Sequence, residues 1–279
     1  MPYATSNNGI LLHYTVDDFT DPWSNAPWIV LQHGFGRNGG FWYKWVPMLA
    51  GHFRILRLDM RGFGKSRQGF SLEQGFALDD LANDVVRVLD HAGVASAHYV
   101  GEAFGGTLGM QVASQYPDRI RTLNLLSAPV ILLPKLQETF ALGEASWGDF
   151  LAKHGPKAWA EQTNGISRFP PSMPQGFLDW YNNLLGETDG ATLARFTHLC
   201  RQYDQTRYLE GITAPVLGVY SNSREEQVEL LRKHVKKLSV VHIDTRFFMV
   251  YLAHPRLCAD AVLHHAATHD GFPVGEQPW

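Results

Sequence analysis

With 279 residues, 45% of them hydrophobic and 18% charged, the chain is long enough for one large α/β domain with an insertion or for two small domains. Its formal net charge of -3 excludes a strongly basic surface for nucleic acid or membrane, and no apolar run approaches the roughly 18 residues of a spanning helix. The two cysteines are too few for a disulfide framework, and the segment Met1–Ser6 lacks the features of a signal peptide. We therefore expect a cytoplasmic protein with no nucleic-acid or membrane partner.

The first half of the sequence alternates between segments typical of strands and segments typical of helices. Continuous apolar runs predict strands buried on both faces of a parallel sheet, and apolar positions three or four residues apart predict helices. The strands are expected at residues 10–16, 28–32, 53–59, 97–100 and 120–126, and the helices at 41–51, 72–92 and 106–116. This alternation implies a parallel sheet with right-handed crossovers.

The alternation stops at about residue 130, and the next 80 or so residues are helical in pattern with no strand. The helices of this insertion are expected at residues 136–145, 147–154, 156–162, 176–185 and 192–203. The core elements then return, as strands at 215–220 and 238–243 and as helices at 225–237 and 255–268. We predict a core domain formed by residues 1–129 and 211–279, and a separate helical unit formed by residues 130–210.

Three glycine-rich turns follow predicted strands. They read HGFG at residues 33–36, DMRGFGKS at 59–66 and GEAFGG at 101–106. Glycine allows backbone conformations that other residues avoid and lets the chain approach a ligand closely. In the third turn, glycines flank Ala103 at a junction between a strand and a helix, which predicts a strained backbone at Ala103.

These turns, in this order and with a helical insertion, resemble the cap-bearing α/β-hydrolase-fold enzymes that cleave esters, lactones and carbon–carbon bonds next to ketones. The resemblance covers nearly the whole chain. It implies an α/β fold with a mostly parallel, doubly wound sheet, and it implies that residues 130–210 form a cap over the active site. It also implies a triad in the order Ser, acid, His, and an oxyanion hole formed by the backbone N–H groups of Phe35 and Phe104.

The positions that the resemblance assigns to the triad carry other residues. Ala103 stands in the nucleophile slot, and its methyl group cannot attack a carbonyl. Counting back seven residues from Pro255 places Phe248 in the histidine slot. The acid slot falls near Arg224, and the next carboxylate is Glu225, which we keep as a candidate acid although the first turn of a helix also favours acidic residues.

A small set of polar and aromatic residues is expected to line a pocket. The candidates are His33, Gly34, Glu102, Trp147, Trp159 and Trp180. Each also has a structural interpretation, such as a buried histidine that braces its loop or aromatic residues that form the core of the insertion. The ligand is expected to be a small, apolar or aromatic carbonyl compound. No metal-ligand spacing, phosphate loop or dinucleotide fingerprint occurs, so no metal or cofactor is predicted.

Three functions remain open at this point. The first is an inactive variant of a hydrolase whose lineage cleaves a small ester, lactone or ketone-adjacent carbon–carbon bond. The second is a natural pseudo-hydrolase that binds a small apolar ligand without turnover. The third is an enzyme with acid–base chemistry that needs no triad, carried by Glu102, His33 or His254. The sequence favours them narrowly in that order.

Overall fold

The computed structural model describes residues 2–272 and residue 274. Within this part of the chain, a central sheet has eight strands in the order β1-β2-β4-β3-β5-β6-β7-β8. The strands are β1 (Tyr3–Thr5), β2 (Leu11–Asp17), β3 (Trp28–Gln32), β4 (Arg54–Leu58), β5 (Ala97–Glu102), β6 (Ile120–Leu126), β7 (Val216–Ser221) and β8 (Leu238–Ile243). Strand β2 pairs antiparallel with β1 and β4, and the other neighbouring pairs are parallel.

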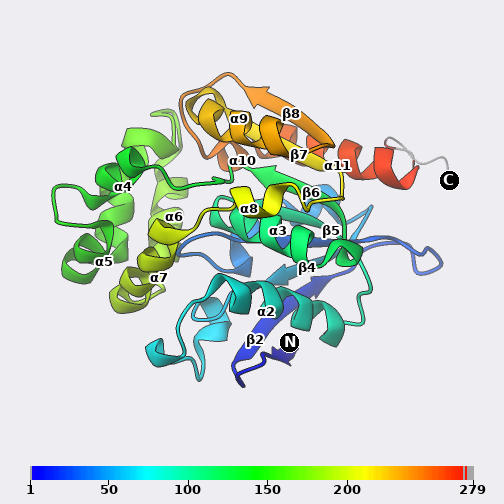
Figure 1. Cartoon of the computed structure of the whole chain (residues 1–279), viewed down its shortest axis with the longest axis horizontal. Helices are drawn as coiled ribbons and strands as arrows, with labels where there is room; N and C mark the ends of the chain where they lie inside the picture. Colours follow the sequence, from blue (N-terminus) through cyan, green and yellow to red (C-terminus); the bar gives the residue numbers. More distant parts are fainter. Residues whose placement is uncertain (1, 273, 275–279) are drawn as a thin grey trace.

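The helices of the core cover both faces of this sheet (Figure 1). They are α1 (Val46–Leu49), α2 (Leu78–His91), α3 (Phe104–Gln115), α8 (Thr206–Leu209), α9 (Glu225–His234), α10 (Val250–Ala253) and α11 (Pro255–Asp270). Contacts connect α2 to α3, α3 to α8 and α8 to α9, and separately connect α1 to α11. The sheet therefore lies between two helical layers, which confirms the predicted α/β, doubly wound and mostly parallel architecture.

The carboxyl ends of the central strands lie at one edge of the sheet. The register pairs Gln32 of β3 with Gly101, Glu102 of β5 with Leu126, and Leu126 of β6 with Val219. Every residue of β5 and β7 is buried, as expected for strands covered on both faces. The loops that follow β3, β5, β6 and β7 are consequently brought together at this edge.

Four long helices are inserted between β6 and β7, and we call them the helical insert. They are α4 (Pro134–Ala141), α5 (Trp147–Thr163), α6 (Gln175–Gly186) and α7 (Gly190–Gln202). They gather at one end of the molecule in Figure 1. Helix α5 is two helical segments that meet at Gly155, whose φ is 82°, so the two helices predicted on either side of that glycine are both present.

Short helical turns account for the differences from the predicted boundaries. Such turns are found at Gly39–Trp42, Gly64–Arg67, Leu72–Gln74, Pro117–Arg119, Asn164–Arg168 and Asn222–Arg224. The helix predicted to begin at residue 72 begins at Leu78, because a capping box between Ser71 and Gln74 closes a separate turn first. Strand β1 was not predicted. No helix in the described part of the chain combines the length and apolar character needed to cross a membrane.

Candidate ligand-binding cavity

The turn between β5 and α3 holds Ala103 in a strained conformation. Its φ is 45° and its ψ is -118°, outside the regions that residues with a side chain normally occupy. The Ala103 N–H donates to the Leu126 carbonyl at 2.9 Å, which fixes the turn to the end of β6. A Cβ atom at Gly105 would collide with the Gln32 carbonyl oxygen, so this position requires glycine. The tight packing of β3, β5 and α3 therefore imposes the strain, which costs roughly 1–3 kcal/mol.

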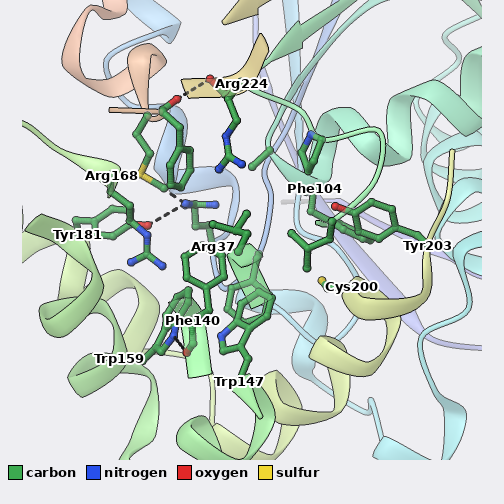
Figure 2. A pocket seen from close by; sticks show the side chains of 18 residues that line it. Arg37, Phe104, Phe140, Trp147, Trp159, Arg168, Tyr181, Cys200, Tyr203 and Arg224 are labelled. Atoms are coloured by element: carbon green, nitrogen blue, oxygen red, sulfur yellow. Dashed lines mark hydrogen bonds between the residues drawn. The ribbon is translucent and has the colours of Figure 1, made fainter. Parts of the chain in front are cut away.

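A cavity of about 70 Å³ lies beside Ala103, between the strand ends and the helical insert. Its lining residues come from the loops after β3, β5, β6, β7 and β8 and from the helical insert; they are Phe35, Arg37, Ala103, Phe104, Ser127, Pro129, Leu132, Leu136, Phe140, Trp147, Trp159, Arg168, Tyr181, Cys200, Tyr203, Arg224, Phe248 and Met249. Figure 2 shows the guanidinium groups of three arginines on one side of the cavity, and Phe140, Trp147 and Trp159 below them.

Aromatic rings form the apolar wall. Trp147 and Trp159 are stacked with ring centroids 5.2 Å apart, and Phe35 lies 4.4 Å from Trp147. The Trp159 Nε1–H donates to the Phe140 carbonyl at 2.9 Å, which fixes that ring. The Trp147 Nε1 atom is buried and has no hydrogen-bond acceptor among the described residues. The wall combines large apolar area with an unused donor.

Arg37 belongs to a buried polar network behind the cavity. Its Nη1 donates to Glu102 Oε1 at 2.9 Å and its Nη2 donates to the Tyr181 hydroxyl at 2.8 Å. Glu102 also accepts from the Tyr251 hydroxyl at 2.7 Å and from the Gly34 backbone N–H. Burial lowers the pKa of Arg37, but the Glu102 carboxylate and the tyrosines outweigh this and hold that pKa above its usual value. The network joins the end of β5 to the helical insert and α10.

Arg168 comes from the turn after α5 and forms no ion pair with a carboxylate of the described residues. Its side chain is only 2% exposed, and its guanidinium lies 4.1 Å above the Trp159 ring. The one hydrogen bond of its guanidinium within the described chain is a long one of 3.4 Å to Asn164 Oδ1, and its buried Nε has no acceptor. Burial lowers the pKa of Arg168. This is a cation held in the cavity wall chiefly by aromatic contacts.

Arg224, from the turn after β7, is held in a similar way. Its guanidinium lies 4.5 Å from the centre of the Phe248 ring and points toward Arg37 in Figure 2. Its Nε is buried without an acceptor, and it has no ion pair with any carboxylate that the structure describes. Burial lowers the pKa of Arg224. Among the residues that the structure describes, neither Arg168 nor Arg224 thus forms an ion pair with a carboxylate.

A model of the alpha/beta hydrolase fold family matches residues 27–205. The chain belongs to the α/β hydrolase family. A relative named "Putative carbamate hydrolase RutD" from Pantoea ananatis is 26% identical over 214 residues, which span 70% of each chain. Another RutD, from Variovorax paradoxus, is 37% identical over 119 residues, 42% of each chain.

Solved structures share the whole architecture of this α/β hydrolase. The enol-lactonase from Burkholderia xenovorans LB400 has a TM-score of 0.81 at 24% identity and covers 95% of this chain and 99% of its own. An esterase from Exiguobacterium antarcticum also has a TM-score of 0.81, at 16% identity, covering 95% of this chain and 98% of its own. At these identities the likeness shows the fold. The resemblance predicted from the three turns is confirmed at the level of the family.

The structure of this α/β hydrolase brings together the three positions at which the sequence predicted the nucleophile, the acid and the histidine of a triad. Ala103, Arg224 and Phe248 line the same cavity. The Phe248 carbonyl accepts from the Ser127 hydroxyl at 2.5 Å, so the loop after β8 is fixed to the end of β6. The backbone N–H groups of Phe35 and Phe104 have no acceptor among the described residues, and both residues line the cavity.

Glu225, the candidate acid, lies elsewhere. It is exposed in the first turn of α9, where it accepts from Arg232 at 2.7 Å and lies 3.6 Å from His242. The interpretation as an acid facing the cavity is wrong, because the turn at Asn222–Arg224 starts a helix that carries this side chain to the surface.

Four of the six predicted pocket residues do not line the cavity, although Trp147 and Trp159 do. His33 is fully buried: its Nδ1 contacts the Gly34 carbonyl at 2.8 Å and its Nε2 accepts from the Met60 N–H at 3.0 Å. Burial lowers its pKa to about 4, so the ring is neutral and braces the loop. Gly34 packs against Glu102, whose hydrogen bonds hold it behind the cavity.

Trp180 is the fourth of these residues. Its ring lies 4.9 Å from Tyr43 and 6.4 Å from Phe41, between α6 and the core. Its neighbour Tyr181 faces the cavity instead, since one step along a helix turns a side chain by about 100°. The sequence reasoning also missed Arg37 and Arg168 as cavity residues, and nothing in the local pattern around either arginine distinguishes it from a surface cation.

Proposed function

We propose that this α/β hydrolase binds a small organic molecule in the cavity beside Ala103 and does not hydrolyse it through a serine triad. One observation carries the proposal: Ala103, Arg224 and Phe248, at the positions expected for nucleophile, acid and histidine, line one cavity. A methyl group cannot attack a carbonyl, a phenyl ring cannot accept a proton, and a guanidinium is not a base. Loss of the nucleophile or the base costs on the order of a million-fold in rate.

The remaining features of the cavity support binding. The N–H groups of Phe35 and Phe104 are free of protein acceptors, as expected of an oxyanion hole that has kept its shape. The helical insert, in the role of a cap, supplies the aromatic wall formed by Trp147 and Trp159. The relatives named as carbamate hydrolase and enol-lactonase support descent from an enzyme that cleaved a small ester, lactone or related carbonyl compound.

Acid–base chemistry without a triad has less support. Glu102 is behind the cavity, with Arg37, Tyr251 and Gly34 as donors. His33 uses both ring nitrogens within its own loop, and His254 is exposed at the start of α11. None of these three groups lines the cavity, so none is placed to exchange a proton with a bound ligand.

The test compares turnover by the unaltered chain with turnover by Ala103→Ser combined with Phe248→His. We expect the unaltered chain to hydrolyse p-nitrophenyl acetate and simple lactones at the buffer rate, and the double variant to gain measurable activity. Phe248→His combined with Ala77→Ser is the matched control, because Ala77 is exposed and far along the chain from the cavity residues. Hydrolysis by the unaltered chain above the buffer rate would overturn the proposal.

A further inference from the structure

We propose that the ligand of this cavity is a small organic carboxylate, recognised by Arg168 and Arg224. The inference rests on the proposed function, because it names the chemical class of the molecule that the cavity binds. It replaces the apolar or aromatic carbonyl compound expected from the sequence with an organic anion.

The charges of the cavity are unbalanced. Arg37, Arg168 and Arg224 all line it, and among the described residues no carboxylate does. Glu102, behind the wall, neutralises Arg37 through the 2.9 Å contact and is further occupied by Tyr251 and Gly34. Arg168 and Arg224 are left without an ion pair in the described part of the chain, and arginine does not lose its proton to relieve this.

Arg168 is buried and Arg224 is half-buried, and aromatic contacts offset only part of the cost of removing these two cations from water. The Arg168 guanidinium lies over Trp159 and the Arg224 guanidinium lies over Phe248, at 4.1 and 4.5 Å. Cation–π attraction is weaker than the loss of hydration that a buried charge suffers. An anion placed between the two side chains would supply a counter-charge, because their guanidinium groups make the cavity a site of positive potential.

Several of the polar groups that line the cavity are hydrogen-bond donors without an acceptor among the described residues. The Nε atoms of Arg37 and Arg168 and the Nε1 of Trp147 are buried without an acceptor in the described chain. The hydroxyl of Ser127, by contrast, is already used on the Phe248 carbonyl. A guanidinium that lies over an aromatic ring can still donate through its N–H edge to the two oxygens of a carboxylate.

The walls distinguish an organic anion from an inorganic one. Most of the other lining side chains are aromatic or aliphatic, among them Phe35, Phe140 and Trp147. A hydrated phosphate or chloride has no apolar part that could pack against these rings. A carboxylate with an apolar tail can pair with the arginines and pack its tail against the rings. The volume of about 70 Å³ favours a short tail, since it is about half that of a cavity of roughly 150 Å³ that holds benzene.

The experiment titrates the unaltered protein with butyrate and with butyramide, its neutral isostere, by calorimetry and tryptophan fluorescence. We expect butyrate to bind at least tenfold more tightly than butyramide, and to raise the melting temperature as a ligand of the native state does. Benzoate and benzamide, inorganic phosphate and chloride complete the series. No variant is needed for this comparison.

Arg168→Met and Arg224→Met test the two arginines separately. Each should weaken butyrate binding by about tenfold or more, as expected for a charge-assisted hydrogen bond, and leave butyramide binding unchanged. Arg195→Met is the matched control, because Arg195 is exposed on α7 of the same helical insert. A variant that fails to fold leaves the other variant and the comparison of butyrate with butyramide to decide.

The outcomes separate the two proposals. Equal affinity for butyrate and butyramide, or for phosphate and butyrate, would overturn the carboxylate inference while the cavity would still bind a ligand. Binding of neither the acids nor the amides would overturn both proposals. Hydrolysis of esters by the unaltered chain would overturn the proposed function alone, since an enzyme could also take an anionic substrate.

Discussion

Replacing Glu102 with Gln should destabilise the native state by about 3–5 kcal/mol, because the change leaves the Arg37 guanidinium buried without a counter-charge. Glu102 is fully buried and Arg37 is 4% exposed, so water cannot take the place of the carboxylate. The carboxylate accepts from Arg37, Tyr251 and the Gly34 backbone N–H. A Gln side chain keeps one acceptor oxygen and adds an NH₂ group that faces groups which are themselves donors.

Thermal unfolding followed by circular dichroism measures this effect. At roughly 2–4 °C per kcal/mol for a large domain, the melting temperature of Glu102→Gln should fall by roughly 6–20 °C. Adding Arg37→Met to Glu102→Gln should recover part of the loss, because the unpaired cation is removed. Glu225→Gln is the control, since its ion pair with Arg232 is exposed and contributes little. A fall for Glu102→Gln no larger than the fall for Glu225→Gln would refute the reasoning.

Three further predictions concern a helix terminus, a close contact and a buried histidine. Ala77 begins α2 with no side-chain cap, so Ala77→Asp should stabilise the fold by about 0.5–2 kcal/mol, measured by urea denaturation. Gly105→Ala should prevent stable folding, because the added Cβ would collide with the Gln32 carbonyl. Gly176→Ala in α6 has open space around it and should stabilise the native state by up to about 1 kcal/mol. Equal effects of the two variants would contradict this. Burial lowers the pKa of His33 to about 4, so the folded state binds fewer protons than the unfolded state as pH falls from about 6.5 to 4. The urea midpoint should therefore be lower at pH 5 than at pH 7, with a slope of up to about 1.4 kcal/mol per pH unit from this group, and equal midpoints would contradict the expectation.

Most of the fold could be predicted because its elements are encoded locally. Strand β7 is a continuous apolar run that is buried on both faces, and periodic apolar positions define α2. The three-residue strand β1 carries no such pattern; it exists because β2 offers it a free edge, and that edge depends on tertiary structure. The start of α2 was missed for a related reason, since the capping box at Ser71 closes a turn that resembles the first turn of a helix.

The cavity could be predicted only in part, because its residues come from segments far apart in the chain. The resemblance to the α/β hydrolases identified Ala103 and Phe248, which the structure places in one cavity. The surroundings of Arg168 depend on how α5 packs against the aromatic rings of the helical insert. The sequence around Arg168 contains no local pattern from which that packing could be predicted. Trp180 and Tyr181 are adjacent aromatic residues, and only the rotation of α6 decides which one faces the cavity.

The strained turn at Ala103 does not depend on the chemistry of its side chain. The Ala103 carbonyl accepts from the N–H groups of Gly106 and Thr107, and its own N–H is bound to the Leu126 carbonyl. These contacts, with the close packing of Gly105, fix φ at 45° for whichever residue stands there. The side chain of Ala103 cannot react, yet the strained turn is present. The turn is therefore kept because the packing of the sheet against α3 requires it. The evidence for what the cavity does therefore comes from the residues that face it, and among those the uncompensated cations of Arg168 and Arg224 are the feature that the fold itself does not require.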